Sequence, residues 1–289
     1  MCDGRVVRTH QWIAIAIASA ALACRPSAAP SSAVVPDAGA DAAPSATADA
    51  HDAGADAQAA RAEEAERDAG PFEEKLGART VWFAVPPRKG PRRLVAMLHG
   101  VCNPPGYACG HWWRAAVEKG FLVCPEGNGR CSWSCEDCRA DRKEGPPSWE
   151  ESFADVDKDL ERAVAKVSDG YPGEIDRDGA VLAGFSRGAY AAVTIARMHP
   201  GRWPYLVLNE ADTEVTAAQL RAAGVRAVVL MAGGAGLNLG PERKTLADLQ
   251  RDGFRAKLVV MPKAGHHYSD DIEELMRQAL AWFDEADAG

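Results

Sequence analysis

The feature that most constrains this sequence is an alternation of short apolar runs with amphipathic segments from residue 71 onward. The runs lack the polar alternation of a half-exposed strand, so they predict strands that are buried on both faces. Between Glu150 and Ser168, apolar side chains recur every three or four residues, which predicts a helix with one buried face. We therefore expect an α/β protein, a three-layer sandwich around a mostly parallel central sheet.

The expected elements follow one another along the chain with few long connections. The longest connection, 125–148, is rich in Gly, Pro and Cys, and loops of that length are usually functional or disordered. Its cysteines favour an ordered loop. The predicted strands are Thr80–Val85, Leu94–Leu98, Phe121–Cys124, Ala180–Gly184, Tyr205–Leu208, Ala227–Met231 and Lys257–Met261, and the predicted helices are Trp112–Lys119, Glu150–Ser168, Arg187–Met198, Thr216–Ala223, Glu242–Asp252 and Asp270–Glu285.

The first seventy residues predict an export signal and a tether. In residues 1–24, basic residues precede an apolar run, Trp12 to Ala23, that is too short to cross a bilayer but fits a signal peptide. The segment ending at Cys24 resembles a bacterial lipobox with Ala21 in the usual leucine position, so Cys24 is a candidate lipidation site and membrane tether. Plain secretion is the alternative. Residues 25–70 hold too few large apolar side chains to fold and predict a disordered linker before a domain at 71–289.

Cysteine usage also favours export to the bacterial envelope or beyond. An even number of cysteines in an exported domain predicts disulfides, but the sequence does not choose the pairing. The C-x3-C-x2-C spacing is an alternative metal-binding pattern. No fourth ligand has clear spacing, so we expect no metal. The six cysteines of the domain are Cys102, Cys109, Cys124, Cys131, Cys135 and Cys138.

The charge distribution argues against nucleic acid as a partner. The chain has 33 Lys and Arg against 41 Asp and Glu, a formal net charge of −8. Residues 1–70 hold ten acidic and five basic side chains, or −5, which leaves −3 for the remainder. A nearly neutral domain without a basic stripe does not provide the phosphate contacts that nucleic-acid binding requires.

A candidate nucleophile lies where a predicted strand meets a predicted helix. Gly184-Phe185-Ser186-Arg187-Gly188 is a G-x-S-x-G pattern, which places Ser186 on a sharp turn with its hydroxyl exposed. The flanking glycines let neighbouring backbone pass without a Cβ clash. Backbone N–H groups at the helix start can then stabilise a developing oxyanion.

Two further segments offer the other parts of an acyl-transfer site. The strand ending at Leu98 runs into His99-Gly100-Val101, so the backbone N–H groups of Val101 and Arg187 are the candidate oxyanion donors. After the last predicted strand, His266 directly follows Gly265 and is the candidate general base, with His267 as the alternative.

Leu98-His99-Gly100, the Ser186 pentapeptide and Gly265-His266 resemble the α/β-hydrolase family, in family order, from about Pro71 to the C-terminus. Within that family, the sequence resembles serine esterases and the dienelactone-hydrolase-like and depolymerase-like members. The resemblance implies a sheet of the eight-strand type, with one early strand lacking here. It also implies serine-based acyl transfer, and that chemistry requires no metal or organic cofactor.

The acid of the family pattern is not at its usual place. It normally follows the next-to-last strand, but here Met231–Asn238 holds no carboxylate. Some family members take the acid from the preceding strand end. There we select Asp212, with Glu210 as the next choice. Glu242, which comes after Asn238 in the sequence, is the third choice. Asp212 suits a helix N-cap equally well.

These features predict an exported serine hydrolase that cleaves carboxylic esters through a Ser-His-acid mechanism and a covalent acyl-enzyme. The substrate would be a small-molecule or polymer-linked ester. The alternative is a catalytically weak or inactive binding protein of the envelope on the same fold. A carboxylate within hydrogen-bond reach of His266 or His267 distinguishes the two hypotheses.

Overall fold

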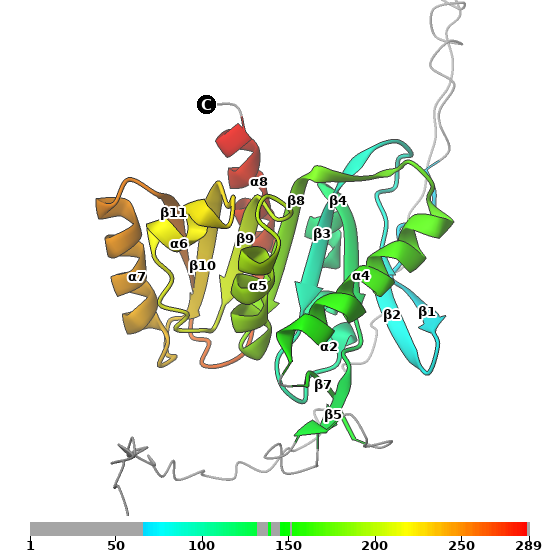
Figure 1. The fold of residues 1–289 in the computed structure, drawn as a ribbon, viewed down its shortest axis with the longest axis horizontal. Coiled ribbons are helices and arrows are strands. Elements are labelled where there is room, and N and C mark those ends of the chain that lie inside the picture. Colours follow the sequence, from blue (N-terminus) through cyan, green and yellow to red (C-terminus); the bar gives the residue numbers. More distant parts are fainter. Residues whose placement is uncertain (1–65, 132–137, 140–144, 151, 288–289) are drawn as a thin grey trace, which may run out of the picture. The chain divides into compact units, whose positions relative to one another are not determined.

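The computed structural model describes residues 66–131, 138–139, 145–150 and 152–287. A central eight-stranded sheet carries helices on both of its faces (Figure 1), which confirms the predicted three-layer α/β architecture. The predicted signal peptide with Cys24 lies outside the described residues. So do the linker up to residue 65, Cys135 and the side chain of Cys138.

The sheet is mostly parallel, in the strand order β1-β2-β4-β3-β8-β9-β10-β11. Strand β2 pairs antiparallel with both β1 and β4, whereas every pairing from β4 to β11 across the sheet is parallel. The parallel strands therefore end at one edge of the sheet, the edge at which α/β folds bind ligands. The strands are β1 (Phe72–Leu76), β2 (Arg79–Ala84), β3 (Arg92–Leu98), β4 (Gly120–Pro125), β8 (Ile175–Phe185), β9 (Tyr205–Asn209), β10 (Ala227–Gly233) and β11 (Arg255–Met261).

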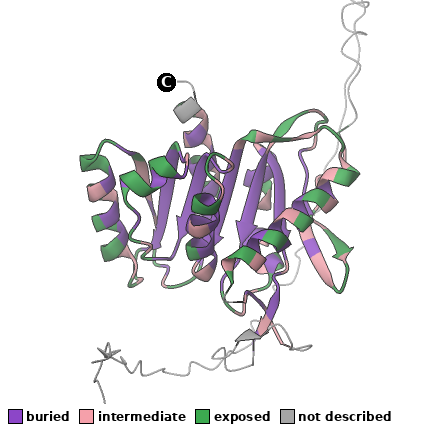
Figure 2. Cartoon of the chain, viewed as in Figure 1, coloured by how far each residue is buried: buried purple, intermediate pink, exposed green. Residues whose placement is uncertain are grey.

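The helices divide between the two faces of the sheet. One face is covered by α4, α5, α6 and α7, and the other by α2, α3 and α8. Strands β4, β9 and β10 are buried along their whole length, in the buried middle layer of Figure 2, as their continuous apolar runs predicted. The helices are α2 (Pro105–Gly110), α3 (Trp113–Val117), α4 (Phe153–Gly170), α5 (Arg187–Met198), α6 (Ala217–Ala222), α7 (Leu239–Arg251) and α8 (Ile272–Asp287).

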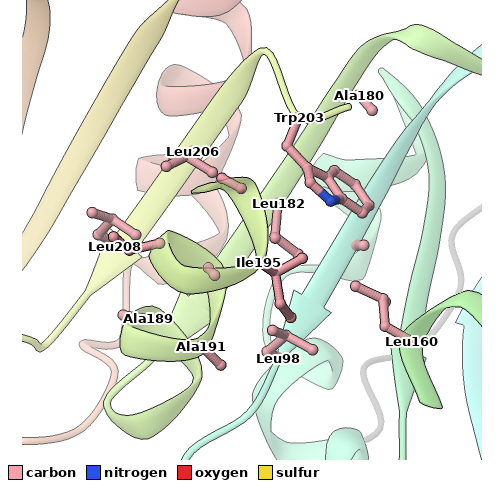
Figure 3. Packing of buried hydrophobic residues seen from close by; sticks show 14 of the residues in the cluster. Leu98, Leu160, Ala180, Leu182, Ala189, Ala191, Ile195, Trp203, Leu206 and Leu208 are labelled. Carbon is pink, nitrogen blue, oxygen red and sulfur yellow. The ribbon is translucent and has the colours of Figure 1, made fainter. Parts of the chain in front are cut away.

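Side chains of one strand alternate between the two faces. Leu182 of β8 packs with Ile195 of α5 and Leu98 of β3 on one face (Figure 3), whereas its neighbour Val181 joins the cluster on the other. All four of these side chains are fully buried. Because the strand leading to Ser186 is locked from both sides, the position of the following turn is set by the core.

Three parts of the fold were not predicted. Strand β1 occupies the place of the early strand that was expected to be lacking, and its middle residues are exposed, so it has no apolar run to reveal it. Helix α2 is too short to show a period. The long loop contains a small three-stranded sheet of β5 (Gly129–Cys131), β6 (Cys138–Arg139) and β7 (Pro147–Ser148).

Two disulfides are present, as the cysteine arithmetic predicted, and the structure decides their pairing. Cys102–Cys131, with Cα atoms 5.5 Å apart, ties the loop after β3 to β5. Cys109–Cys124, with Cα atoms 6.8 Å apart, ties α2 to β4. In the part of the chain that the structure describes, no group of His, Cys, Asp and Glu side chains could hold a metal, and no helix is long and apolar enough to span a bilayer.

Candidate active site

Ser186 lies on a sharp turn between β8 and α5, the strand–turn–helix arrangement that its motif predicts. Its backbone is left-handed, with φ 54° and ψ −120°, a conformation that is costly for a residue with a Cβ. A Cβ on Gly188 would lie 2.0 Å from the Leu98 carbonyl oxygen, so only glycine allows α5 to approach β3 here. The Ser186 N–H donates to the Asn209 carbonyl oxygen at 2.8 Å, which attaches the turn to the end of β9.

The structure brings His266, from the loop after β11, to the Ser186 hydroxyl. Its Nε2 lies 2.9 Å from Ser186 Oγ. His267 is turned elsewhere, because its Nδ1 lies 2.8 Å from the Tyr268 carbonyl oxygen and its Nε2 accepts from the Gly265 N–H. Of the two histidines left open by the sequence, His266 is the one within hydrogen-bond reach of the serine.

Glu210 supplies a carboxylate on the far side of the imidazole. It directly follows β9, and its Oε2 lies 3.2 Å from His266 Nδ1. The Glu210 side chain is fully buried, whereas that of His266 is 55% exposed. Like Ser186, Glu210 has a left-handed backbone, with φ 55°, and its N–H donates to the Met231 carbonyl oxygen at 2.8 Å.

The Glu210 carboxylate is held in its charged form. Burial opposes its ionisation, but hydrogen bonds from His266, the Gly233 N–H and the Asn238 amide outweigh burial and lower the pKa of Glu210. The Gly233 N–H reaches Oε1, and Asn238 Nδ2 reaches Oε2 at 3.1 Å. The sequence gives no signal for either donor, because one is the backbone N–H of the last residue of β10 and the other is the amide of a residue in the following loop.

Asp212, the acid selected from the sequence, does not contact His266. It is exposed, and its Oδ1 accepts the Tyr190 hydroxyl of α5. Nor does it cap the next helix, since Thr216 is the N-cap of α6. The reason is position along the chain: Glu210 directly follows β9 and reaches the imidazole, whereas Asp212 lies two residues farther along. The structure therefore replaces Asp212 by Glu210 as the candidate acid.

Glu242, the third choice, is also separate from the imidazole. It lies on α7, and its Oε1 accepts the Ala211 N–H at 3.2 Å. Its contact is with the backbone that follows Glu210 and not with a histidine. Glu242 is thus near the site without being part of its hydrogen-bonded line.

The two candidate oxyanion donors lie on either side of Ser186. A Cβ on Gly100 would be 3.4 Å from Ser186 Cβ, so the loop that carries Val101 lies directly against the serine. Arg187 is the first residue of α5, and N–H groups of a first helical turn have no partner within the helix. Neither the Val101 N–H nor the Arg187 N–H donates to another residue of the described chain.

A small cavity opens beside the Ser186–His266 pair. Its volume is about 280 Å³. A larger hollow of about 820 Å³, lined by arginines that include Arg92 and Arg177, contains neither Ser186 nor His266, so size alone does not mark the site. The smaller cavity is lined by Cys102, Asn103, Pro104, Tyr107, Phe185 and His266.

No protein-family model matches the sequence, and no curated protein sequence matches it. Solved structures, in contrast, do match this chain. The chain is similar to an esterase from Pyrobaculum calidifontis, with 15% identity, 78% of this chain and 88% of that chain covered, and a TM-score of 0.53. It is also similar to an S-formylglutathione hydrolase from Agrobacterium tumefaciens, with 18% identity, 74% and 94% covered, and a TM-score of 0.50. A ferulic acid esterase matches with 14% identity, 74% and 96% covered, and a TM-score of 0.50. At these identities the likeness concerns the fold.

Proposed function

We propose that this chain, which has the α/β-hydrolase fold, is a serine hydrolase that cleaves carboxylic esters. The observation that carries the proposal is the hydrogen-bonded line from Ser186 Oγ through His266 to Glu210. A nucleophile, a base within reach of it and a carboxylate that orients the base make up the arrangement that acyl transfer needs. The carboxylate beside His266 favours an enzyme over the alternative of an inactive binding protein.

In the proposed reaction, Ser186 Oγ attacks the ester carbonyl carbon while His266 Nε2 removes the hydroxyl proton. The buried Glu210 accepts the Nδ1–H of His266, which selects the tautomer whose Nε2 is free to accept a proton. The same carboxylate stabilises the imidazolium that forms. The half-exposed imidazole and the buried carboxylate suit these two roles, because the base must meet substrate and the acid must not.

The charge that develops on the carbonyl oxygen would be stabilised by the backbone N–H groups of Val101 and Arg187. Such donors act without reorganisation, because the backbone holds them in place before the substrate arrives. His266 then returns the proton to the leaving alcohol, which leaves Ser186 acylated. A water molecule deprotonated by His266 cleaves the acyl-enzyme and restores the serine.

The size of the cavity favours esters with a small acyl or alcohol group at the reacting carbonyl. At about 280 Å³ it is slightly smaller than the ~300–1,000 Å³ typical of pockets that enclose a whole drug-sized ligand. Tyr107 and Phe185 give it two aromatic walls. A larger or polymer-linked substrate would have to keep its remaining bulk outside the cavity.

Export and a lipid tether at Cys24 are part of the proposal. Two disulfides in the described chain support an oxidising compartment. Mass spectrometry of the N-terminal peptide of the mature protein would test export and lipidation. A lipid-modified Cys24 as the first residue is expected, and an unprocessed chain that starts at Met1 would contradict export.

The direct test of the function is Ser186→Ala. We expect a fluorophosphonate probe to label the wild-type chain and not the variant, and turnover of p-nitrophenyl butyrate to fall at least ~10³-fold. Ser168→Ala, a serine of α4 on another part of the domain, is the matched control and should keep both signals. A wild-type chain that neither takes the label nor hydrolyses the ester would refute the proposal.

A further inference from the structure

A buried carboxyl group that the proposed mechanism does not use lies next to the candidate acid. Glu242 on α7 is only 1% exposed. Its Oε1 accepts the Ala211 N–H, and its Oε2 is buried without a hydrogen-bond partner among the described residues. Buried carboxyl oxygens without partners are rare, because their loss of hydration is not compensated.

The backbone group that Glu242 binds belongs to the turn that presents Glu210. Ala211 directly follows Glu210, whose left-handed φ of 55° is unfavourable for a residue with a side chain. Such a conformation persists only where the surrounding contacts hold it. The Glu210 N–H is held by Met231, and the next N–H along the chain is held by Glu242. The two bonds fix the peptide groups on both sides of Glu210.

The surroundings of Glu242 disfavour its charged form. The titratable groups that act on it are Glu210 and Asp212, after β9, and Tyr190 of α5, whose hydroxyl donates to Asp212. On α7 itself, Arg243 and Lys244 are exposed, and Lys244 pairs with Asp248. None of the described cationic side chains pairs with Glu242. A charge here would therefore be both buried and repelled.

The net result of these effects is a raised proton affinity of Glu242. Burial raises its pKa, the hydrogen bond from Ala211 lowers it, and the neighbouring Glu210 and Asp212 raise it further, to about 9. The group is thus neutral around pH 7. A neutral carboxyl group can accept from Ala211 without repelling the Glu210 carboxylate.

We propose that Glu242 is a positioning residue whose uncharged carboxyl group holds the turn that presents Glu210 to His266. Above the point where Glu242 loses its proton, a second buried anion faces Glu210 and Asp212, and repulsion loosens the turn. The inference rests on the proposed function, since it assigns Glu242 a part in the same site. It predicts an alkaline limit to turnover that comes from α7 and not from a group touching the substrate.

The test compares two substitutions of Glu242 across pH. Glu242→Leu removes the acceptor for Ala211, and we expect kcat to fall ~10-fold with little change in KM, because a buried N–H is left without a partner. Glu242→Gln keeps a side-chain oxygen that can accept from the Ala211 N–H but has no proton to lose, so its kcat should be close to that of the parent. In the parent, kcat should decline above about pH 9, and in Glu242→Gln that decline should be absent. Equal kcat in Glu242→Leu and the parent would overturn the positioning role.

A matched control and a second measurement separate this inference from the function. Asp248→Asn removes a carboxylate from the exposed face of the same helix and should keep the alkaline decline. Thermal unfolding reports the protonation of Glu242 without an activity assay. As the pH rises from about 5 to about 9, the parent should lose stability relative to Glu242→Gln. The reason is that the unfolded parent chain releases a proton that the folded chain keeps. An inactive parent would refute the proposed function. If the stabilities of the parent and of Glu242→Gln changed with pH in the same way, the neutral state of Glu242 would be refuted, whatever the activity.

Discussion

Two neighbouring turns of this protein place the candidate nucleophile and the candidate acid by opposite means. Ser186 follows β8 and Glu210 follows β9, and both non-glycine residues have a left-handed backbone, with φ of 54° and 55°. The strands are adjacent and parallel, and the Ser186 N–H donates to Asn209, the residue before Glu210. The same unfavourable conformation thus occurs twice at one edge of the sheet.

The difference lies in what holds each turn. The Ser186 turn is permitted by glycines within two residues of it, Gly184 and Gly188, whose missing side chains let β8, α5 and β3 meet. The Glu210 turn has no glycine beside it and depends on groups more than 20 residues away, in β10 and α7. A locally encoded turn has a sequence motif. A turn held by distant contacts has none.

Removing the charge at the Glu210 turn should have the largest effect. Glu210→Gln keeps the shape but cannot stabilise the His266 imidazolium or enforce its tautomer, so we expect kcat to fall ~10³- to 10⁴-fold. Asp212→Asn is the matched control. Because the exposed Asp212 side chain bonds to the Tyr190 hydroxyl and not to His266, kcat should change less than about threefold. Steady-state hydrolysis of a short-chain ester measures both. The reverse ranking would restore Asp212 as the acid.

Adding one carbon at the Ser186 turn should have the next largest effect. In Gly188→Ala the new Cβ would meet the Leu98 carbonyl oxygen at 2.0 Å, so β3 and α5 must separate, at a cost of about 1–3 kcal/mol of the free energy of unfolding. Gly240→Ala in α7 is the control. Its Cβ meets nothing within 4 Å, and alanine favours a helix over glycine by up to ~1 kcal/mol. Urea denaturation measures both, and equal stabilities would contradict the close approach.

Weakening one distant contact of the Glu210 turn should have the smallest effect. Asn238→Ala removes the amide that donates to Glu210 Oε2, which raises the pKa of Glu210 and loosens its carboxylate. The other donors remain, so we expect kcat to fall only ~5-fold. Leu237→Ala, at a 90% exposed neighbouring position, should leave kcat unchanged. A loss in Asn238→Ala as large as in Glu210→Gln would mean that one amide, and not a network, holds the acid.

The parts of the fold that were predictable are those with a local or periodic signal. Continuous apolar runs such as Ala227–Met231 indicated buried parallel strands, and the structure has β10 there. Strand β1 lacked such a run, because an edge strand buries little. The cysteines indicated disulfides, but the pairs Cys102–Cys131 and Cys109–Cys124 depend on how α2 and β5 lie against their neighbours.

The sequence by itself determined the α/β layering, the turn that exposes Ser186 and the segment that supplies His266, because each depends on residues close together in the chain. Only the tertiary structure shows that His266 and not His267 lies at Ser186, and that Glu210 and not Asp212 lies at His266. Those choices depend on where β10, β11 and α7 bring the Gly233 N–H, the Asn238 amide and the Glu242 carboxyl group. A buried carboxylate is located by the donors that compensate its lost hydration, and here those donors come from distant segments.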